Sequence, residues 1–103
     1  MELKLDTEKF DQLQVALVEE IIKTIRVKVQ EAGVEGLEME NLTANLAFSI
    51  TSILDDTSVI ESDGMAVKPY LAFWDGDNEI THCGENAYTY EFVTPALDNI
   101  FDN

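Results

Sequence analysis

Apolar residues recur at spacings of three and four along the first third of the chain. The stripe comprises Phe10, Leu13, Leu17, Ile21, Ile25, Val29 and Ala32, widened by Val18 and Ile22. This spacing predicts an amphipathic helix over about residues 7–32. Asp6 and Thr7 are the expected N-cap residues, and Gly33 can take the left-handed conformation that ends a helix.

The length of this helix bears on assembly. At about 1.5 Å per residue it would extend roughly 39 Å, whereas a globule of 100 residues is only about 34 Å across. Two hypotheses follow: one end of the helix overhangs, or its broad stripe packs against a second copy of the chain in a homodimer.

A second helical pattern follows the short link at residues 33–36. Its apolar positions are Met39, Leu42, Leu46, Phe48, Ile50, Ile53 and Leu54, with threonine and serine on the other side. Two helices joined by so short a link should form an antiparallel hairpin. Asp63-Gly64 marks a turn beyond the second helix.

Aromatic and branched residues then dominate, and they predict a β-hairpin. The first strand is "VKPYLAFW", residues 67–74, the turn is "DGDN", and the second strand is "EITHC", residues 79–83. Both faces of the first strand are apolar, so we expect it to be covered on each side. In this interpretation Trp74 is buried, and Asp75, Asp77 and Glu79 point outward.

Residues 87–93 allow two interpretations. Alternation favours a strand, after which Thr94 caps a short helix with Pro95 at its first position. Alternatively one helix, capped by Asn86, runs through Pro95 at a cost of about 3 kcal/mol. With the strand, the fold class is α+β in a single domain, 1–103. An N-terminal antiparallel helical hairpin packs on a small antiparallel sheet of two or three strands, and a short C-terminal helix follows.

Charge is the unusual property of the composition. The 103 residues include 21 acids and 6 bases, for a net charge of −15, and residues 35–103 contain fourteen acids and one base, Lys68. Such a surface repels nucleic acid and anionic membranes and attracts basic proteins or cations. General solubility or a saline habitat would give the same composition without any partner.

Little in the sequence indicates a membrane or an oxidising compartment. No apolar run approaches the ~20 residues of a membrane helix, and the first residues lack the apolar core of a signal peptide. The one cysteine, Cys83, cannot form an intrachain disulfide. We therefore expect a cytoplasmic protein with no membrane association.

The residues that could carry chemistry do not converge. His82 and Cys83 are neighbours in a predicted strand, so their side chains point to opposite faces, and no second Cys or His is present to complete a zinc site. Asp75, Asp77 and Glu79 resemble a calcium loop, but the EF-hand register places Ile80 and Asn86 at its most constrained positions. The adjacent acids at positions 19–20 and 55–56 are interpreted as solvated surface pairs. We expect neither catalysis nor a cofactor.

The sequence therefore favours a small acidic, non-enzymatic interaction domain of the inhibitor type, docking on a basic protein surface. The acidic face expected to bind the partner comprises Glu61, Asp63, Asp75, Asp77, Glu79 and Glu85. The alternative is a small ligand- or cation-binding domain with a weak site at the turn from Asp75 to Glu79.

Overall fold

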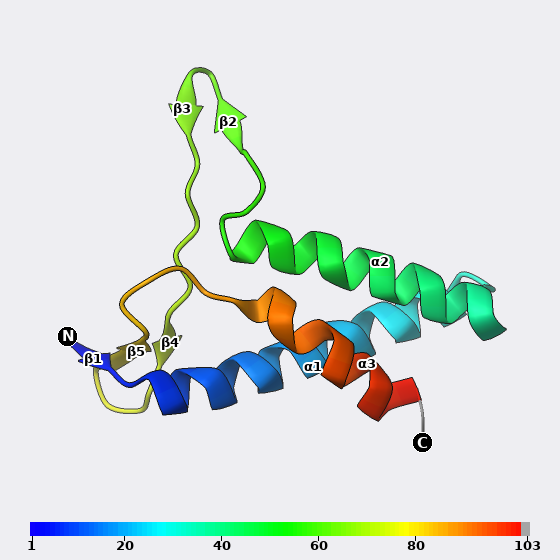
Figure 1. Cartoon of the computed structure of the whole chain (residues 1–103), viewed down its shortest axis with the longest axis horizontal. Coiled ribbons are helices and arrows are strands. Elements are labelled where there is room, and N and C mark those ends of the chain that lie inside the picture. The colour runs from blue at the N-terminus through cyan, green and yellow to red at the C-terminus, as the bar shows by residue number, and fades with distance from the viewer. Residues whose placement is uncertain (102–103) are drawn as a thin grey trace.

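The computed structural model describes residues 1–101 and has the predicted α+β class (Figure 1). In chain order the elements are β1 (Glu2–Leu5), α1 (Thr7–Glu31), α2 (Gly36–Leu54), β2 (Glu61–Ser62), β3 (Met65–Ala66), β4 (Phe73–Trp74), β5 (Glu79–His82), the 3-10 helix η1 (Thr89–Phe92) and α3 (Val93–Phe101). The helices form one body, the sheet β1–β5–β4 lies beside the start of α1, and β2–β3 projects away from both.

The first and last residues of α1 agree with the helix predicted over about residues 7–32. The Asp6 side chain accepts a hydrogen bond from the Lys9 amide at 3.0 Å, which satisfies one of the free donors in the first turn. Gly33 ends the helix at a φ of +89°, a region that favours glycine. α2 returns along α1 and completes the predicted hairpin.

The buried side of α2 is only in part the one that its amphipathic pattern predicts. Met39 is buried and Phe48 packs on the core, as expected. Thr43, Ala47 and Thr51 are fully buried, whereas the larger Leu42, Leu46, Ile50 and Ile53 are 37–45% exposed. This side of α2 faces α3 as well as α1, since Ala47 packs with Val93 and Ala96. The Thr51 hydroxyl is satisfied within its own helix by the Ala47 carbonyl at 2.9 Å. Burial of this side leaves the larger apolar side chains on the other side of α2 at the surface.

The core lies where α3 packs on the helical hairpin. Its buried members are Val18, Ile22, Ala47, Val93 and Ala96, with Ile25, Phe48, Phe92, Leu97, Ile100 and Phe101 packed around them. Residues from all three helices thus share one core, which orders the C-terminal segment.

The strand favoured for residues 87–93 is wrong. The chain instead enters η1 and continues as α3, and Pro95 lies third in α3, within a first turn where an absent amide hydrogen costs least. Asp55 accounts for the helical choice, because its carboxylate accepts bonds from the Thr89 and Tyr90 amides at 2.9 Å each. The interpretation of the pair at 55–56 as solvated surface is wrong for Asp55, which is only 4% exposed.

The sheet contains the predicted hairpin together with a strand that the sequence did not predict. β4 and β5 pair antiparallel, but β4 covers only two of the eight residues expected in that strand. β1 pairs with β5 in parallel, with Leu3 opposite Ile80 and Leu5 opposite His82. The sheet is therefore mixed, with β5 at its centre.

β2 and β3 form a two-stranded arm around the turn expected at Asp63-Gly64. Both turn residues have positive φ, +50° and +78°, as tight hairpin turns with an Asp-Gly sequence require. Neither side of the arm is covered, since Glu61, Ser62, Met65 and Ala66 are all exposed.

Candidate partner-binding surface

The outer side of the sheet presents apolar and aromatic side chains to solvent. Strand register places Leu3, Ile80 and Trp74 in one row, with Leu5 and His82 in the next. Tyr70, just before β4, joins them through a 2.9 Å hydrogen bond between its hydroxyl and Nδ1 of His82. We call this surface the aromatic sheet face: Leu3, Leu5, Tyr70, Trp74, Ile80 and His82.

The opposite side of the sheet packs on α1. Phe73 meets Phe10 edge to face at a ring separation of 5.4 Å, and Thr81 is completely buried. Because successive side chains of a strand point to opposite faces, this packing turns Trp74 outward. The expectation that the strand is covered on each side and buries Trp74 is wrong: Trp74 is 67% exposed.

His82 and Cys83 have separate hydrogen-bond partners. His82 is hydrogen-bonded to Tyr70, while the Cys83 thiol points to the Glu85 carbonyl at 3.1 Å. Cys83 is half-buried rather than fully buried, and it lies outside the strand.

The acidic turn between β4 and β5 lies beside the aromatic sheet face, but its three acids differ in their surroundings. Asp75 is held within the protein, 4.0 Å from the Lys9 ammonium and accepting a 3.1 Å hydrogen bond from the Thr81 hydroxyl. Asp77 at the tip is exposed, and Glu79 is half-buried beside Glu2 in the strand register. Of the three carboxylates, Asp77 is thus the most accessible to a partner.

The remaining acids of the expected partner-binding face lie in two places. Glu85 is exposed in the segment after β5, near the sheet. Glu61 and Asp63 lie on the β2–β3 arm, which projects away from β4 and β5 (Figure 1). The structure therefore brings four of the six residues to the sheet and places two on the arm.

The electrostatic setting of the sheet is strongly negative. The segments that form the sheet and its connections, residues 1–6 and 70–86, contain six acids and one base, Lys4. Their formal charge of −5 surrounds a patch of uncharged side chains. A binding surface with an apolar centre and a charged rim has this composition.

Metal chemistry has no support in the geometry. Within residues 1–101, no three His, Cys, Asp or Glu side chains are placed so that they could hold a metal ion together. At the turn, the Lys9 ammonium and the Thr81 hydroxyl each contact one oxygen of the Asp75 carboxylate.

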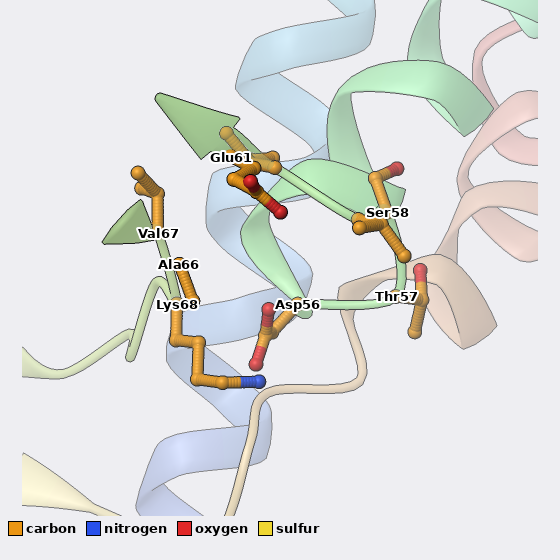
Figure 2. Close-up of a pocket in the computed structure, with 9 residues that line it drawn as sticks. Asp56, Thr57, Ser58, Glu61, Ala66, Val67 and Lys68 are labelled. Carbon is orange, nitrogen blue, oxygen red and sulfur yellow. The ribbon is translucent and has the colours of Figure 1, made fainter. Parts of the chain in front are cut away.

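Hollows also occur near the end of α2, away from the sheet. One, of about 140 Å³, is at the base of the arm, where Figure 2 shows Asp56 and Lys68 at the same end of the space. Another, of about 380 Å³, is lined by Asp55, Tyr88 and Tyr90 among others, and there Asp55 is already bonded to Thr89 and Tyr90. Both hollows are lined by polar and apolar side chains from the end of α2 and from the segments that follow it.

Sequence reasoning missed the aromatic sheet face for an identifiable reason. Leu3 and Leu5 alternate with Glu2 and Lys4, a period-two pattern typical of a strand. That short signal could have predicted β1, and with it a three-stranded sheet whose outer row includes Trp74.

The chain matches no known protein family, curated protein or solved structure in any of the three comparisons made. No helix in residues 1–101 combines the length and the apolar character that crossing a membrane requires. The function must therefore be argued from the surface of the molecule.

Proposed function

We propose that this protein is a non-enzymatic interaction domain that docks on a basic protein surface through its aromatic sheet face. The observation that carries the proposal is the exposure of Trp74, Tyr70, Leu3 and Leu5 on one side of the sheet, at 51–67% each. The partner, in this view, presents lysines or arginines around a small apolar ridge.

The apolar side chains would supply most of the binding free energy. Tryptophan and tyrosine are the residues most often found at the energetic centre of protein interfaces, where their rings become fully covered. The hydrogen bond between Tyr70 and His82 holds both rings in place before binding, which lowers the entropic cost of docking.

The acids would supply selectivity and speed. Asp77, Glu79 and Glu85 lie around the sheet, and like the net charge of −15 they favour approach of a cationic partner. The same charges disfavour nucleic acid and anionic membranes. A cytoplasmic location, expected from the single cysteine, stays a prediction.

The test uses Trp74 as its own reporter, because it is the one tryptophan in the chain. The probe is an amphipathic peptide with lysines on one face and leucines on the other, titrated at low and at high salt. We expect the Trp74 emission to shift to shorter wavelength on binding, with an affinity that falls as salt rises. The control is a peptide of the same pattern with glutamates in place of lysines.

Two variants locate the surface. Asp77→Lys should slow association several-fold with little change in dissociation, as expected for a charge at the rim. Leu5→Ser should mainly speed dissociation, because it removes apolar contact area. Binding of the lysine peptide that is indifferent to salt and to both variants would contradict the proposal.

A further inference from the structure

Another exposed apolar surface lies on the helical hairpin. Leu42, Leu46, Ile50 and Ile53 recur at spacings of three and four along α2, all on one side. Ile50 joins Leu17, Ile21 and Ile25 of α1 around a hollow of about 270 Å³. We call this surface the helical face: Leu17, Ile21, Ile25, Leu42, Leu46, Ile50 and Ile53.

The α2 part of this face is left uncovered by the fold, whereas Leu17, Ile21 and Ile25 of α1 are half-buried. α3 and η1 pack against the hairpin at Val18, Ile22, Ala47 and Phe48. On α2, Phe48 is turned about 100° or more from Leu46, Ile50 and Ile53, because each residue of a helix advances by that angle. The contact with α3 therefore leaves this apolar row of α2 in solvent.

We propose that a second copy of this chain covers the helical face, forming a symmetric dimer in which the two α1–α2 hairpins pack together. A symmetric pair requires the same patch on both copies, and two-helix hairpins can meet this condition as a four-helix arrangement. The hypothesis of a dimer through the N-terminal helix is thereby extended to α2, which supplies the more exposed row.

The distribution of charge favours a second copy of this chain as the partner that covers the helical face. Residues 41–54 contain no Asp, Glu, Lys or Arg, which makes them the longest uncharged stretch of a chain with net charge −15. Two such chains repel each other wherever their acids approach. The helical hairpin, residues 7–54, has a net charge of only −4, from twelve charged residues, so it is the part where two copies can come together.

The named residues make up most of the area that an interface needs. On α2 the row from Leu42 to Ile53 is about 17 Å long, and two neighbouring helices present a width of roughly 20 Å. The product is on the order of 350 Å² per copy, and the residues around the row supply the rest of the ~500 Å² per partner that a specific interface needs.

The dimer and the docking on a basic partner respond to salt in opposite directions. Added salt screens the repulsion between two acidic copies and should strengthen the dimer, whereas it weakens attraction to a basic partner. The dimer does not depend on the proposed function, and either proposal can fail without the other.

The experiment is sedimentation equilibrium over a range of protein and salt concentrations. We expect a mass approaching twice the 11.5 kDa of one chain, reached at lower protein concentration as salt is added. Leu46→Glu should return the protein to a monomer. Leu3→Glu is the matched control, since Leu3 is an exposed leucine of the aromatic sheet face, and it should leave the dimer intact.

Far-ultraviolet circular dichroism of each variant verifies that it is folded. Should Leu46→Glu fail to fold, the uncharged Leu46→Gln replaces it, with an expected rise of about tenfold or more in the dissociation constant, because apolar area is lost from both copies. A monomeric wild type at about 1 mM protein and high salt would overturn the proposal. So would a dimer that Leu46→Glu and Leu46→Gln leave unchanged, or one that Leu3→Glu disrupts.

Discussion

The carboxylate of Asp55 holds Thr89, a residue thirty-four positions further along the chain. Its Oδ1 accepts both the Thr89 amide at 2.9 Å and the Thr89 hydroxyl at 2.7 Å, while Oδ2 accepts the Tyr90 amide. One side chain at the end of α2 thus acts as the cap of η1, and so positions the segment that leads into α3.

Replacing this carboxylate should weaken the fold. In Asp55→Asn, one of the two oxygens becomes an amide donor facing another donor, so we expect the free energy of unfolding to fall by about 2 kcal/mol. Urea denaturation measures the change. Asp56→Asn is the matched control, because Asp56 is half-buried with a φ of +60° that asparagine tolerates. An equal loss in both variants would contradict the capping role.

The Thr43 hydroxyl is a second buried polar group, and it has no hydrogen-bond partner within the described residues. Thr43→Val keeps the shape of the side chain and removes the unsatisfied group, so it should raise the free energy of unfolding by about 1 kcal/mol. Thr51→Val provides the comparison, because it loses the bond to the Ala47 carbonyl and should be neutral or destabilising. Denaturant unfolding of both variants measures the difference. The free energy of unfolding should be clearly higher for Thr43→Val than for Thr51→Val.

The pKa of the Tyr88 hydroxyl can be used to detect its contact with Asp11 of α1. Its hydroxyl donates to Oδ1 of Asp11, and this bond, together with burial and the charge of Asp11, raises the pKa of Tyr88 to about 12. A raised pKa means that the fold stabilises the protonated hydroxyl. This contribution is complete below about pH 10, the usual tyrosine pKa, and is lost as pH rises through about 12.

Ultraviolet absorbance of the phenolate, with Tyr88→Phe to identify the signal, measures this transition. Asp11→Asn should lower the pKa of Tyr88, since it removes the charge of the acceptor. Asp98→Asn, at an exposed position in α3, is the control and should leave the transition in place. A Tyr88 transition unaltered by Asp11→Asn would show that the bond is absent in solution.

The exposure of Trp74 can be measured without any partner. With 67% of its surface in solvent, its fluorescence in the native protein should be quenched by iodide and acrylamide almost as efficiently as in the unfolded chain. Iodide should be the less efficient of the two, because the acids around the sheet repel an anion. Strong protection of the native fluorescence from acrylamide would show that the aromatic sheet face is covered.

The correct predictions from the sequence are those for which several local signals indicate the same structure. The spacing from Phe10 to Val29, the cap at Asp6 and the glycine at position 33 all indicated the same helix, and the structure has it. Asp63-Gly64 and the residues from Asp75 to Asn78 were turns for reasons of backbone conformation alone. These local signals needed no knowledge of the rest of the chain.

The errors arose where a long-range contact decided the outcome. Nothing near Asp55 in the sequence shows that Thr89 and Tyr90 will bond to it, so both the burial of Asp55 and the helical path of residues 89–92 were missed. In α2, the pattern could not show that the side with Thr43 and Thr51 would be covered, and that Leu46 and Ile50 would stay exposed. Trp74 was placed inside because a small domain was expected to cover its largest aromatic side chain.

The parallel pairing of β1 with β5 has a consequence for the order of folding. Glu2 is opposite Glu79, seventy-seven positions later, whereas the α1–α2 hairpin joins neighbours in the chain. Contacts between distant residues form slowly, because a long loop must close first. As the ribosome extends the chain, the helical hairpin can assemble while β1 is still without a partner. The aromatic sheet face is therefore completed late, and so is any binding that depends on it.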